Sequence, residues 1–379
     1  MRFLSHCLRQ SLQPITPVRH IGRVPQMKLT PFLTGLALTG AGTYLASRYL
    51  NFHPKPVEQE DPVSLPRAPF LSPGQRIKVL TYNVQFFAGT EYSFFYDGGP
   101  DTLVEARDIE ITILGFATFI AAHDPDFILL QEVDQGARRT AYLDEVELVR
   151  AALPYALRNH VATYYWKSRF VPHPKILGSA GTRLVLFSRY PLAKARRYQL
   201  ALSPGNPIER DFNFKRAILE VELTLANGET FVILNTHLEP FPKRTNVLER
   251  QIDTVLRRLN ALDQLKRPWI LGGDFNLLPP GQWARLPAAA RGSHTEPSEI
   301  SAVFQRYDGV PRIGDATGEA MRKYFTFTQR SGADRIPVRT LDYLFAAPTV
   351  TIERYAVLRE GVSHLSDHLP VIGEFKLPG

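Results

Sequence analysis

A buried strand that ends in an acid and an amide constrains the fold of this chain more than any other feature. The segment is Leu271–Leu277, with the sequence Leu-Gly-Gly-Asp-Phe-Asn-Leu. Side chains alternate faces along a strand, so Asp274 and Asn276 should share one face while Phe275 points into the core. The two glycines allow another backbone or a ligand to come close. Taken alone, the segment is equally consistent with an Asp/Asn turn that carries no chemistry.

Four other segments share this design, in which an apolar strand ends in polar residues suited to a metal ion or a phosphate. They are Leu80–Val84, Ile128–Asp134, Ile233–Glu239, and the C-terminal pair Leu341–Tyr343 with Ser366–Pro370. In this order, and together with Gly273–Asn276, they resemble the endonuclease/exonuclease/phosphatase superfamily, which includes DNase I-like nucleases, neutral sphingomyelinases and inositol polyphosphate 5-phosphatases. Each motif alone is weak, whereas five in order are a specific signal.

The resemblance implies a four-layer α/β sandwich, in which two mixed sheets pack face to face with helices outside. The order of elements permits this architecture, because helical patterns at residues 107–123, 141–153 and 246–265 alternate with strand patterns. All five motifs would then converge at one end of the sheets. Asn83 and His368 would meet at one cleft although they lie far apart in the sequence.

The resemblance assigns metal binding to Asn83, Glu132 and Asp367. Glu132 follows the apolar strand Phe127–Leu130, where a carboxylate has no reason to be buried unless it binds a cation. Hard oxygen ligands favour Mg²⁺ or Mn²⁺ over zinc. The single cysteine, Cys7, excludes an internal disulfide and a cysteine-based metal site. The alternative for Asn83 is a turn at the end of its strand.

The resemblance also implies catalytic roles for the remaining motif residues, in a reaction in which water attacks phosphorus. Asp274 would orient or deprotonate the water, and Asn276 would hold a nonbridging phosphoryl oxygen. Asp342 would fix the tautomer of His368, as a carboxylate does in other catalytic triads. This pair and His237 would polarise the phosphorus centre or assist the leaving group. A lone histidine such as His237 is, in the alternative, a structural residue.

Contacts with the rest of the substrate are less well defined by the sequence. Arg138 and Arg139 lie on a loop and either bind the substrate phosphate or form a solvated basic pair. The aromatic, glycine-rich loop at residues 86–101 would cap the site, touch lipid or stack on a base, or it is a buried structural loop. Gln85 stands where some family members carry an acid, which weakens a match to abasic-site nucleases. The pair Arg183-Leu184 also departs from the family pattern, so the substrate shape at that edge stays open.

The N-terminal segments differ from the rest of the chain. Residues 1–28 are basic and contain no Asp or Glu, and residues 29–47 are uncharged and moderately apolar. As a helix, the second stretch would span roughly 28 Å, close to the ~30 Å hydrocarbon core of a bilayer. A transmembrane anchor is the preferred interpretation; a cleaved signal peptide, an organellar presequence and a start at Met27 are alternatives. The flanking charges predict that the catalytic domain lies on the extracytoplasmic side.

A proline-rich linker at residues 48–74 leads to a catalytic domain at residues 75–379. Six prolines between Asn51 and Gly74 predict an extended tether. The first 72 residues hold 8 Lys and Arg against 3 Asp and Glu, which is +5 of the net charge of +8. The catalytic domain is therefore nearly balanced, and the pI of about 9.5 says more about topology than about nucleic-acid binding.

Together these features predict a divalent-metal-dependent phosphodiesterase or phosphatase. The near-neutral domain, the predicted anchor and the sphingomyelinase-like motif Asn-Thr-His-Leu-Glu favour a phospholipid or other membrane-derived phosphodiester as substrate. A nuclease is the runner-up, because its phosphate contacts need basic residues that only folding can gather. An inactive phosphate-binding module is the alternative from another class, although Glu132, Asp274 and His368 are all present. No protein partner is implied.

Overall fold

The computed structural model describes residues 41–240, 245–329 and 336–379. The chain divides into two compact units, and the second, Tyr44–Gly379, contains the catalytic domain. The basic segment at residues 1–28 lies outside the described residues, as does most of the anchor predicted at residues 29–47. Within the described residues, no helix is long and apolar enough to cross a membrane.

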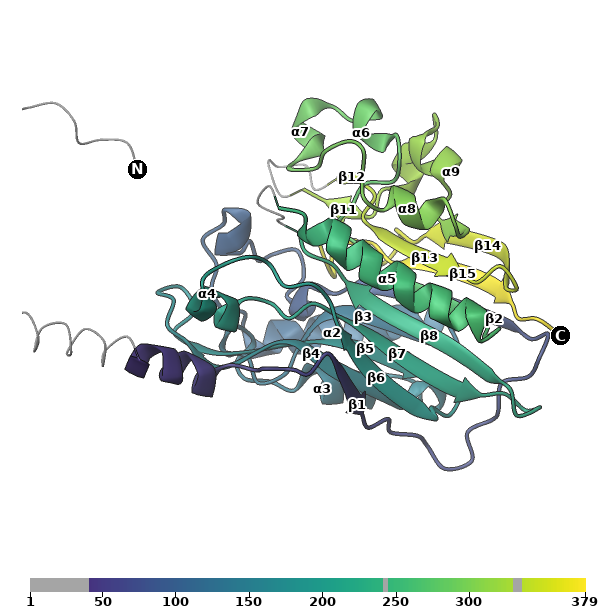
Figure 1. The fold of residues 1–379 in the computed structure, drawn as a ribbon, viewed down its shortest axis with the longest axis horizontal. Coiled ribbons are helices and arrows are strands. Elements are labelled where there is room, and N and C mark those ends of the chain that lie inside the picture. The colour runs from purple at the N-terminus through teal and green to yellow at the C-terminus, as the bar shows by residue number, and fades with distance from the viewer. Residues whose placement is uncertain (1–40, 241–244, 330–335) are drawn as a thin grey trace, which may run out of the picture. The chain divides into compact units, whose positions relative to one another are not determined.

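Two mixed β-sheets form the centre of the second unit (Figure 1). The six-stranded sheet consists, in spatial order, of β14 (Thr351–Val357), β15 (Val371–Lys376), β2 (Arg76–Asn83), β3 (Phe127–Asp134), β5 (Gly178–Ser188) and β4 (Asn159–Val171). The seven-stranded sheet consists of β1 (Val57–Glu60), β6 (Lys194–Gln199), β7 (Ala217–Thr224), β8 (Thr230–His237), β9 (Trp269–Asp274), β13 (Asp342–Ala346) and β10 (Gly309–Val310). The short strands β11 (Phe327–Thr328) and β12 (Pro337–Arg339) pair with each other.

Successive side chains of the central strands point to opposite faces of the sheet and so pack into two different cores. On β3, Phe127 and Leu129 belong to the core shared with the seven-stranded sheet, whereas Ile128 and Leu130 belong to a second core. That second core is closed by α2 (Ala106–His123) and α3 (Glu145–Ala152). On the other side of the molecule, α5 (Val247–Gln264) lies across the seven-stranded sheet (Figure 1). The layers thus follow the order helix, sheet, sheet, helix, which confirms the predicted four-layer sandwich.

Short helical elements connect the strands. The short α-helices among the described residues are α4 (Pro207–Phe212), α6 (Gln282–Arg285), α7 (Ala288–Arg291), α8 (Ser301–Phe304) and α9 (Ile313–Thr317). Single 3₁₀ turns occur at η1 (Gln85–Phe87), η2 (Phe95–Asp97), η3 (Arg138–Thr140), η4 (Tyr155–Leu157) and η5 (Met321–Tyr324). Strand β11 begins shortly after η5 ends.

Two glycines allow the sheets and strands to approach closely beside the site. A Cβ atom at Gly272 would lie 2.6 Å from Leu129 Cδ1 and 3.3 Å from Thr81 Cβ, both on the six-stranded sheet. A Cβ atom at Gly273 would lie 2.1 Å from the carbonyl oxygen of Thr236 on β8. Close packing therefore requires both glycines of this strand, in agreement with the sequence prediction.

A buried pair of amides joins the two sheets next to the site. Gln131 Nε2 on β3 donates a 2.7 Å hydrogen bond to Asn235 Oδ1 on β8. Asn235 Nδ2 donates to the backbone carbonyls of Leu130 and Val185, at 2.9 and 3.0 Å. Both amide side chains are completely buried. Because an unpaired buried amide is costly, these bonds favour one packing arrangement of the sheets.

The proline-rich segment at residues 48–74 is extended, but it is not the free tether that the sequence predicts. Its strand β1 pairs with the edge strand β6, and Leu71 is completely buried. Residues 44–50 are helical, and Ser47 Oγ donates a 2.9 Å hydrogen bond to Asp211 on α4. The segment binds to the domain because β6 offers an unpaired edge and the core offers a place for Leu71.

Candidate active site

Residues of four of the five motifs line one cavity of about 800 Å³, and Asn83 of the remaining motif donates hydrogen bonds to the lining residues Glu132 and Asp274. The predicted residues that line the cavity are Glu132, Arg139, His237, Asp274, Asn276, Asp367 and His368. Asn83 and His368 come together because β15 pairs with β2, with Val371 opposite Thr81. The segment that precedes β15 therefore lies at the end of β2, as the predicted cleft requires.

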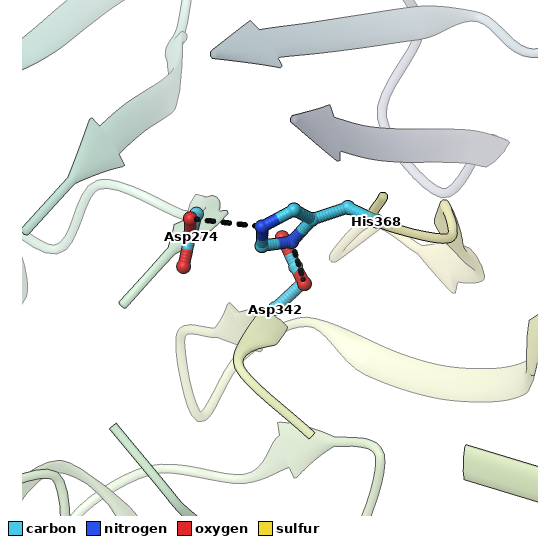
Figure 2. Close-up of side chains that lie close together, drawn as sticks. All are labelled: Asp274, Asp342 and His368. Atoms are coloured by element: carbon cyan, nitrogen blue, oxygen red, sulfur yellow. Dashed lines mark hydrogen bonds and ion pairs between the residues drawn. The ribbon is translucent and has the colours of Figure 1, made fainter. Parts of the chain in front are cut away.

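Asp274, His368 and Asp342 form the centre of the site and are called the central trio (Figure 2). His368 Nδ1 donates a 2.8 Å hydrogen bond to Asp342 Oδ2, and His368 Nε2 lies 3.7 Å from Asp274 Oδ2 (Figure 2). The two acids are neighbours because β13 pairs with β9, with Asp342 opposite Asp274. Asp342 thus has the geometry needed to fix the tautomer of His368.

The surroundings of the central trio shift the proton affinities of its members. Burial disfavours a charged His368, but the carboxylates of Asp342 and Asp274 outweigh this effect and raise the pKa of His368 to about 10. Burial raises the pKa of Asp274 to about 7, although His368 acts in the opposite direction. At neutral pH the imidazole is therefore a cation, and Asp274 exchanges a proton near neutrality.

Glu132 lies in a bulge within β3, whereas the sequence predicts that the strand ends before it. The pairing register shifts between Leu130 and Val133, and Glu132 has a φ of 58°, which is uncommon for a residue other than glycine. Asn83 Nδ2 donates a 3.2 Å hydrogen bond to Glu132 Oε1. Burial and the nearby carboxylate of Asp367 raise the pKa of Glu132. A bound cation would stabilise two acids held this close together.

The residues present fit a divalent cation. Asn83, Glu132 and Asp367 offer the oxygen donors that Mg²⁺ and Mn²⁺ prefer. The central trio is a second candidate, because its ligand atoms lie within 4.8 Å of one another. In that trio, however, His368 Nδ1 and Asp342 Oδ2 are already bonded to each other. The set around Glu132 therefore fits the cation better.

His237 ends β8 beside Asp274, which ends the neighbouring strand β9. Its Nε2 lies 3.4 Å from Asp274 Oδ2 and 3.9 Å from Glu132 Oε1, and its Nδ1 lies 3.4 Å from Tyr165 Oη. Burial, together with two positively charged neighbours, lowers the pKa of His237 well below its usual range. The ring is neutral at physiological pH and acts as a hydrogen-bonding group.

Asn276 reaches the cavity by a different route from the one predicted. β9 ends at Asp274, and Asn276 has a φ of 52°, so the segment is not extended there. The Asn276 backbone N–H donates to Asp274 Oδ1 at 2.9 Å, and its Nδ2 donates to the carbonyl of Leu238 at 3.1 Å. The segment is thus both an Asp/Asn turn and part of the site. Nδ2 carries a second hydrogen atom that suits a phosphoryl oxygen.

The two predicted substrate-binding arginines have other partners. Arg139 lines the cavity, but it donates two hydrogen bonds to Asp134, at 2.7 and 2.9 Å, and a third to Thr182 at 3.0 Å. Arg138 donates to the carbonyl of Ile176 and does not line the cavity. Arg139 is thus the counter-charge of the buried Asp134 and not part of a solvated basic pair. Its contact with the substrate phosphate stays a prediction.

Arg216 is a candidate site residue that the sequence analysis does not identify. Its buried guanidinium lies between the rings of Tyr165 and Phe214, at 5.0 and 4.5 Å from their centroids. Its Nε and Nη1 atoms have no hydrogen-bond partner among the described residues. A buried guanidinium without an acid favours an anionic ligand. The available sequence signal is the basic pair Lys215-Arg216 at the start of an apolar strand.

Comparison with known proteins agrees with this geometry. The sequence model of the Endonuclease/Exonuclease/phosphatase family matches residues 80–368, which include the motifs from β2 to His368. The chain belongs to this family. A search of curated proteins found no match.

Solved structures with the same fold include other endonuclease/exonuclease/phosphatase proteins. One from Beutenbergia cavernae is 20% identical, with a TM-score of 0.51 over 80% of this chain and 72% of that chain. The human Nocturnin catalytic domain with bound sulfate is 19% identical, with a TM-score of 0.50 over 83% and 97% of the two chains. A functionally unknown conserved protein from Enterococcus faecalis is 16% identical, with a TM-score of 0.51 over 79% and 99%. At these identities the likeness shows the fold.

Proposed function

We propose that this protein is a divalent-metal-dependent phosphodiesterase in which water attacks phosphorus. The observation that supports this proposal is that Glu132, His237, Asp274 and His368 line one cavity, with Asn83 and Asp342 hydrogen-bonded directly behind them. The link between the groups is direct, because Asn83 Nδ2 lies 3.2 Å from Glu132 and 3.0 Å from Asp274. Members of this family are generally hydrolases of phosphoesters.

Each group of residues has its own role in the proposed reaction. A divalent cation at Asn83, Glu132 and Asp367 would supply positive charge against the phosphoryl oxygens. Asp274 is suited to take a proton from the attacking water, because a general base works best with a pKa near the working pH. His368, which its two acidic neighbours keep protonated, places a positive charge where negative charge develops on the phosphoryl group.

Three further side chains supply phosphate contacts. The neutral His237 offers a ring N–H beside Asp274, so it binds a phosphoryl or leaving-group oxygen without adding a charge. Arg216 offers the unpaired Nε and Nη1 atoms to an anion. Asn276 completes the set with its second amide hydrogen.

We favour a membrane-derived phosphodiester, of phospholipid or sphingolipid type, over a nucleic acid as substrate. A nucleic acid binds through many phosphates and needs several free basic side chains. In this protein the domain is nearly charge-balanced, and Arg139 is engaged by Asp134. The N-terminal anchor and the extracytoplasmic position of the domain stay predictions from the sequence.

An assay with controlled metal content tests the proposal. The full chain is treated with chelator and assayed with and without Mg²⁺ or Mn²⁺ on methyl p-nitrophenyl phosphate, sphingomyelin, phosphatidylcholine and plasmid DNA. We expect cleavage of a lipid that depends on the metal, is lost in Asp274→Asn and is retained in the surface control Asp253→Asn on α5. Cleavage of DNA alone would support the nuclease instead. A folded protein that binds Mg²⁺ but cleaves no substrate would support the inactive phosphate-binding module.

A further inference from the structure

The cavity has an apolar part in addition to its catalytic wall. The aromatic compartment, as we call it, is the part lined by Phe86, Phe94, Phe95, Trp166, Val171 and Ile176. Protein interiors contain few voids larger than a water molecule, so a cavity of about 800 Å³ is not a packing defect. Its volume falls in the range of small-molecule binding sites, which are mostly apolar with a few polar groups.

The aromatic loop at residues 86–101 builds one wall of this compartment. Phe86 lies edge-on to Phe94, with centroids 5.0 Å apart, and its ring faces the Arg139 guanidinium at 3.5 Å. Phe86 and its two neighbours all have positive φ angles, between 43° and 49°, in a region that disfavours residues other than glycine. Such strain gathers at functional sites, where the surrounding structure maintains it.

Three polar side chains of the cavity lining, Arg139, Ser179 and Trp166, are bonded within the protein. Arg139 is bound to Asp134 and Thr182. Ser179 Oγ and Trp166 Nε1, which also line the cavity, donate to backbone carbonyls at 2.6 and 2.9 Å. A nucleobase in a protein site is recognised by hydrogen bonds to its edges as well as by stacking. These bonded groups therefore suit a ligand portion that makes no hydrogen bonds.

One ring of the cavity lining is itself partly exposed. Tyr96 lines the cavity and is 42% exposed. Phe170 and Leu177 are 40% and 52% exposed and are next in sequence to the lining residues Val171 and Ile176. Exposed apolar side chains beside a binding site are typical of a surface that meets another apolar phase.

We propose that the aromatic compartment binds an aliphatic chain of the substrate. The chain and the phosphate of one lipid phosphoester then occupy two parts of the same cavity. The proposal rests on the phosphodiesterase function proposed above, because the catalytic wall is what places the phosphate. It narrows the substrate to a lipid whose chain enters the protein, as opposed to a lipid recognised through its headgroup alone.

Binding of monoalkyl phosphates tests this proposal without turnover. The full chain, in chelator and without detergent, is titrated with ethyl, butyl, hexyl, octyl and decyl phosphate by calorimetry. We expect the affinity to rise about two- to fourfold for each added methylene until the compartment is full, since burial of a methylene is worth at most about fourfold. The heat capacity change should also become more negative with chain length. An affinity that does not depend on chain length would overturn the proposal.

A matched pair of variants tests the location of the chain. Ile176→Trp places a large ring in the compartment, whereas Leu114→Trp places it at an exposed position of α2 that does not line the cavity. We expect Ile176→Trp to weaken decyl phosphate binding at least tenfold and Leu114→Trp to leave it within twofold of the native value. Val171→Trp is a second filling variant should Ile176→Trp fold poorly by circular dichroism. Unchanged decyl phosphate binding in both filling variants would contradict the assignment.

Two further arms separate the outcomes. If adenosine monophosphate binds more tightly than ribose 5-phosphate, and Ile176→Trp removes the difference, the compartment binds a nucleobase and the chain proposal is wrong. Binding that depends on chain length, together with no cleavage of any phosphodiester, would contradict the proposed function but support the chain site. Cleavage of methyl p-nitrophenyl phosphate without any effect of chain length on binding would contradict the chain site alone.

Discussion

At the scale of single residues, Asp342 is bonded to His368 behind the cavity wall. It is completely buried, and its Oδ2 accepts the 2.8 Å hydrogen bond from His368 Nδ1. Its negative charge is also one of the two that keep His368 protonated. Asp342 is therefore a positioning residue in the proposed mechanism, and its replacement should change the protonation of His368 as well as the rate.

The variant Asp342→Asn tests this role. We expect kcat/KM to fall by about 10²–10⁴, because the amide neither fixes the same tautomer nor holds a charge beside the imidazole. The pKa of His368, followed by NMR, should fall, because one of the carboxylates that raise it is lost. Asp253→Asn on the surface of α5 is the control. A loss of activity with an unchanged pKa of His368 would indicate that Asp342 has only a structural role.

The loop residue His294 should make stability depend on pH. Burial, together with Arg339, lowers the pKa of His294 from 6.5 to about 4. Between these two pH values the unfolded chain therefore binds more protons than the folded chain. The contribution of His294 to the free energy of unfolding is fully present above pH 6.5 and is lost as the pH falls towards 4. We expect the contribution to be about 2–3 kcal/mol. The free energy of unfolding of His294→Gln should decrease less than that of the native protein across this window; parallel curves would refute the assignment.

At the scale of elements, the site depends on how β3, β8 and β9 are held together. The amide pair Gln131–Asn235 connects β3 to β8 immediately before Glu132 in the sequence. His237 and Asp274 then meet because β8 and β9 pair in parallel, with these two residues opposite each other. The catalytic groups thus sit on strands whose mutual positions are set by buried bonds, which is what a preorganised site needs.

The variant Asn235→Ala tests the connection between the sheets. It removes three buried hydrogen bonds, one accepted from Gln131 Nε2 and two donated to the backbone carbonyls of Leu130 and Val185. We expect a loss of about 2–4 kcal/mol in the free energy of unfolding, measured with urea. The control is Asn227→Ala in the exposed β7–β8 turn, which should cost less than about 1 kcal/mol. Equal effects of the two substitutions would show that the amide pair is not important for stability.

At the scale of the whole molecule, the segment before residue 75 is part of the folded domain. Strand β1 extends the seven-stranded sheet, Leu71 fills a core position, and Leu65 N–H donates a 2.7 Å hydrogen bond to Asn159 Oδ1. A chain cut at the predicted domain boundary, residue 75, would therefore lose contacts that belong to the core.

Two truncated chains test this boundary. A chain that begins at Tyr44 keeps β1 and Leu71, whereas a chain that begins at Gln75 loses both. We expect the shorter chain to be less stable by several kcal/mol, because burial of Leu71 alone is worth about 1.5–3 kcal/mol, and to aggregate through the open edge of β6. Urea denaturation and light scattering check this. Equal stability of the two chains would support the original interpretation of residues 48–74 as a linker outside the folded domain.

The sequence by itself determined the architecture and most of the site, because its five ordered motifs resemble a known family whose fold and site residues follow from that resemblance. Apolar strands that end in acids, amides and histidines predict Asn83, Glu132, His237, Asp274, Asp367 and His368, and all six lie together in the structure. The glycines of β9 were also predicted from their local setting, since close packing beside a strand end is a requirement of the backbone.

Only the tertiary structure decided which partners the remaining side chains find. Arg139 donates hydrogen bonds to Asp134, whereas Nε and Nη1 of the buried Arg216 have no hydrogen-bond partner among the described residues. Glu132 lies in a bulge of β3, where the pairing with β5 shifts in register. The aromatic compartment likewise needs the loop at residues 86–101 and the β4–β5 hairpin side by side. These features depend on contacts between segments far apart in the chain, and local residue patterns do not specify which side chain satisfies a buried charge or lines a cavity.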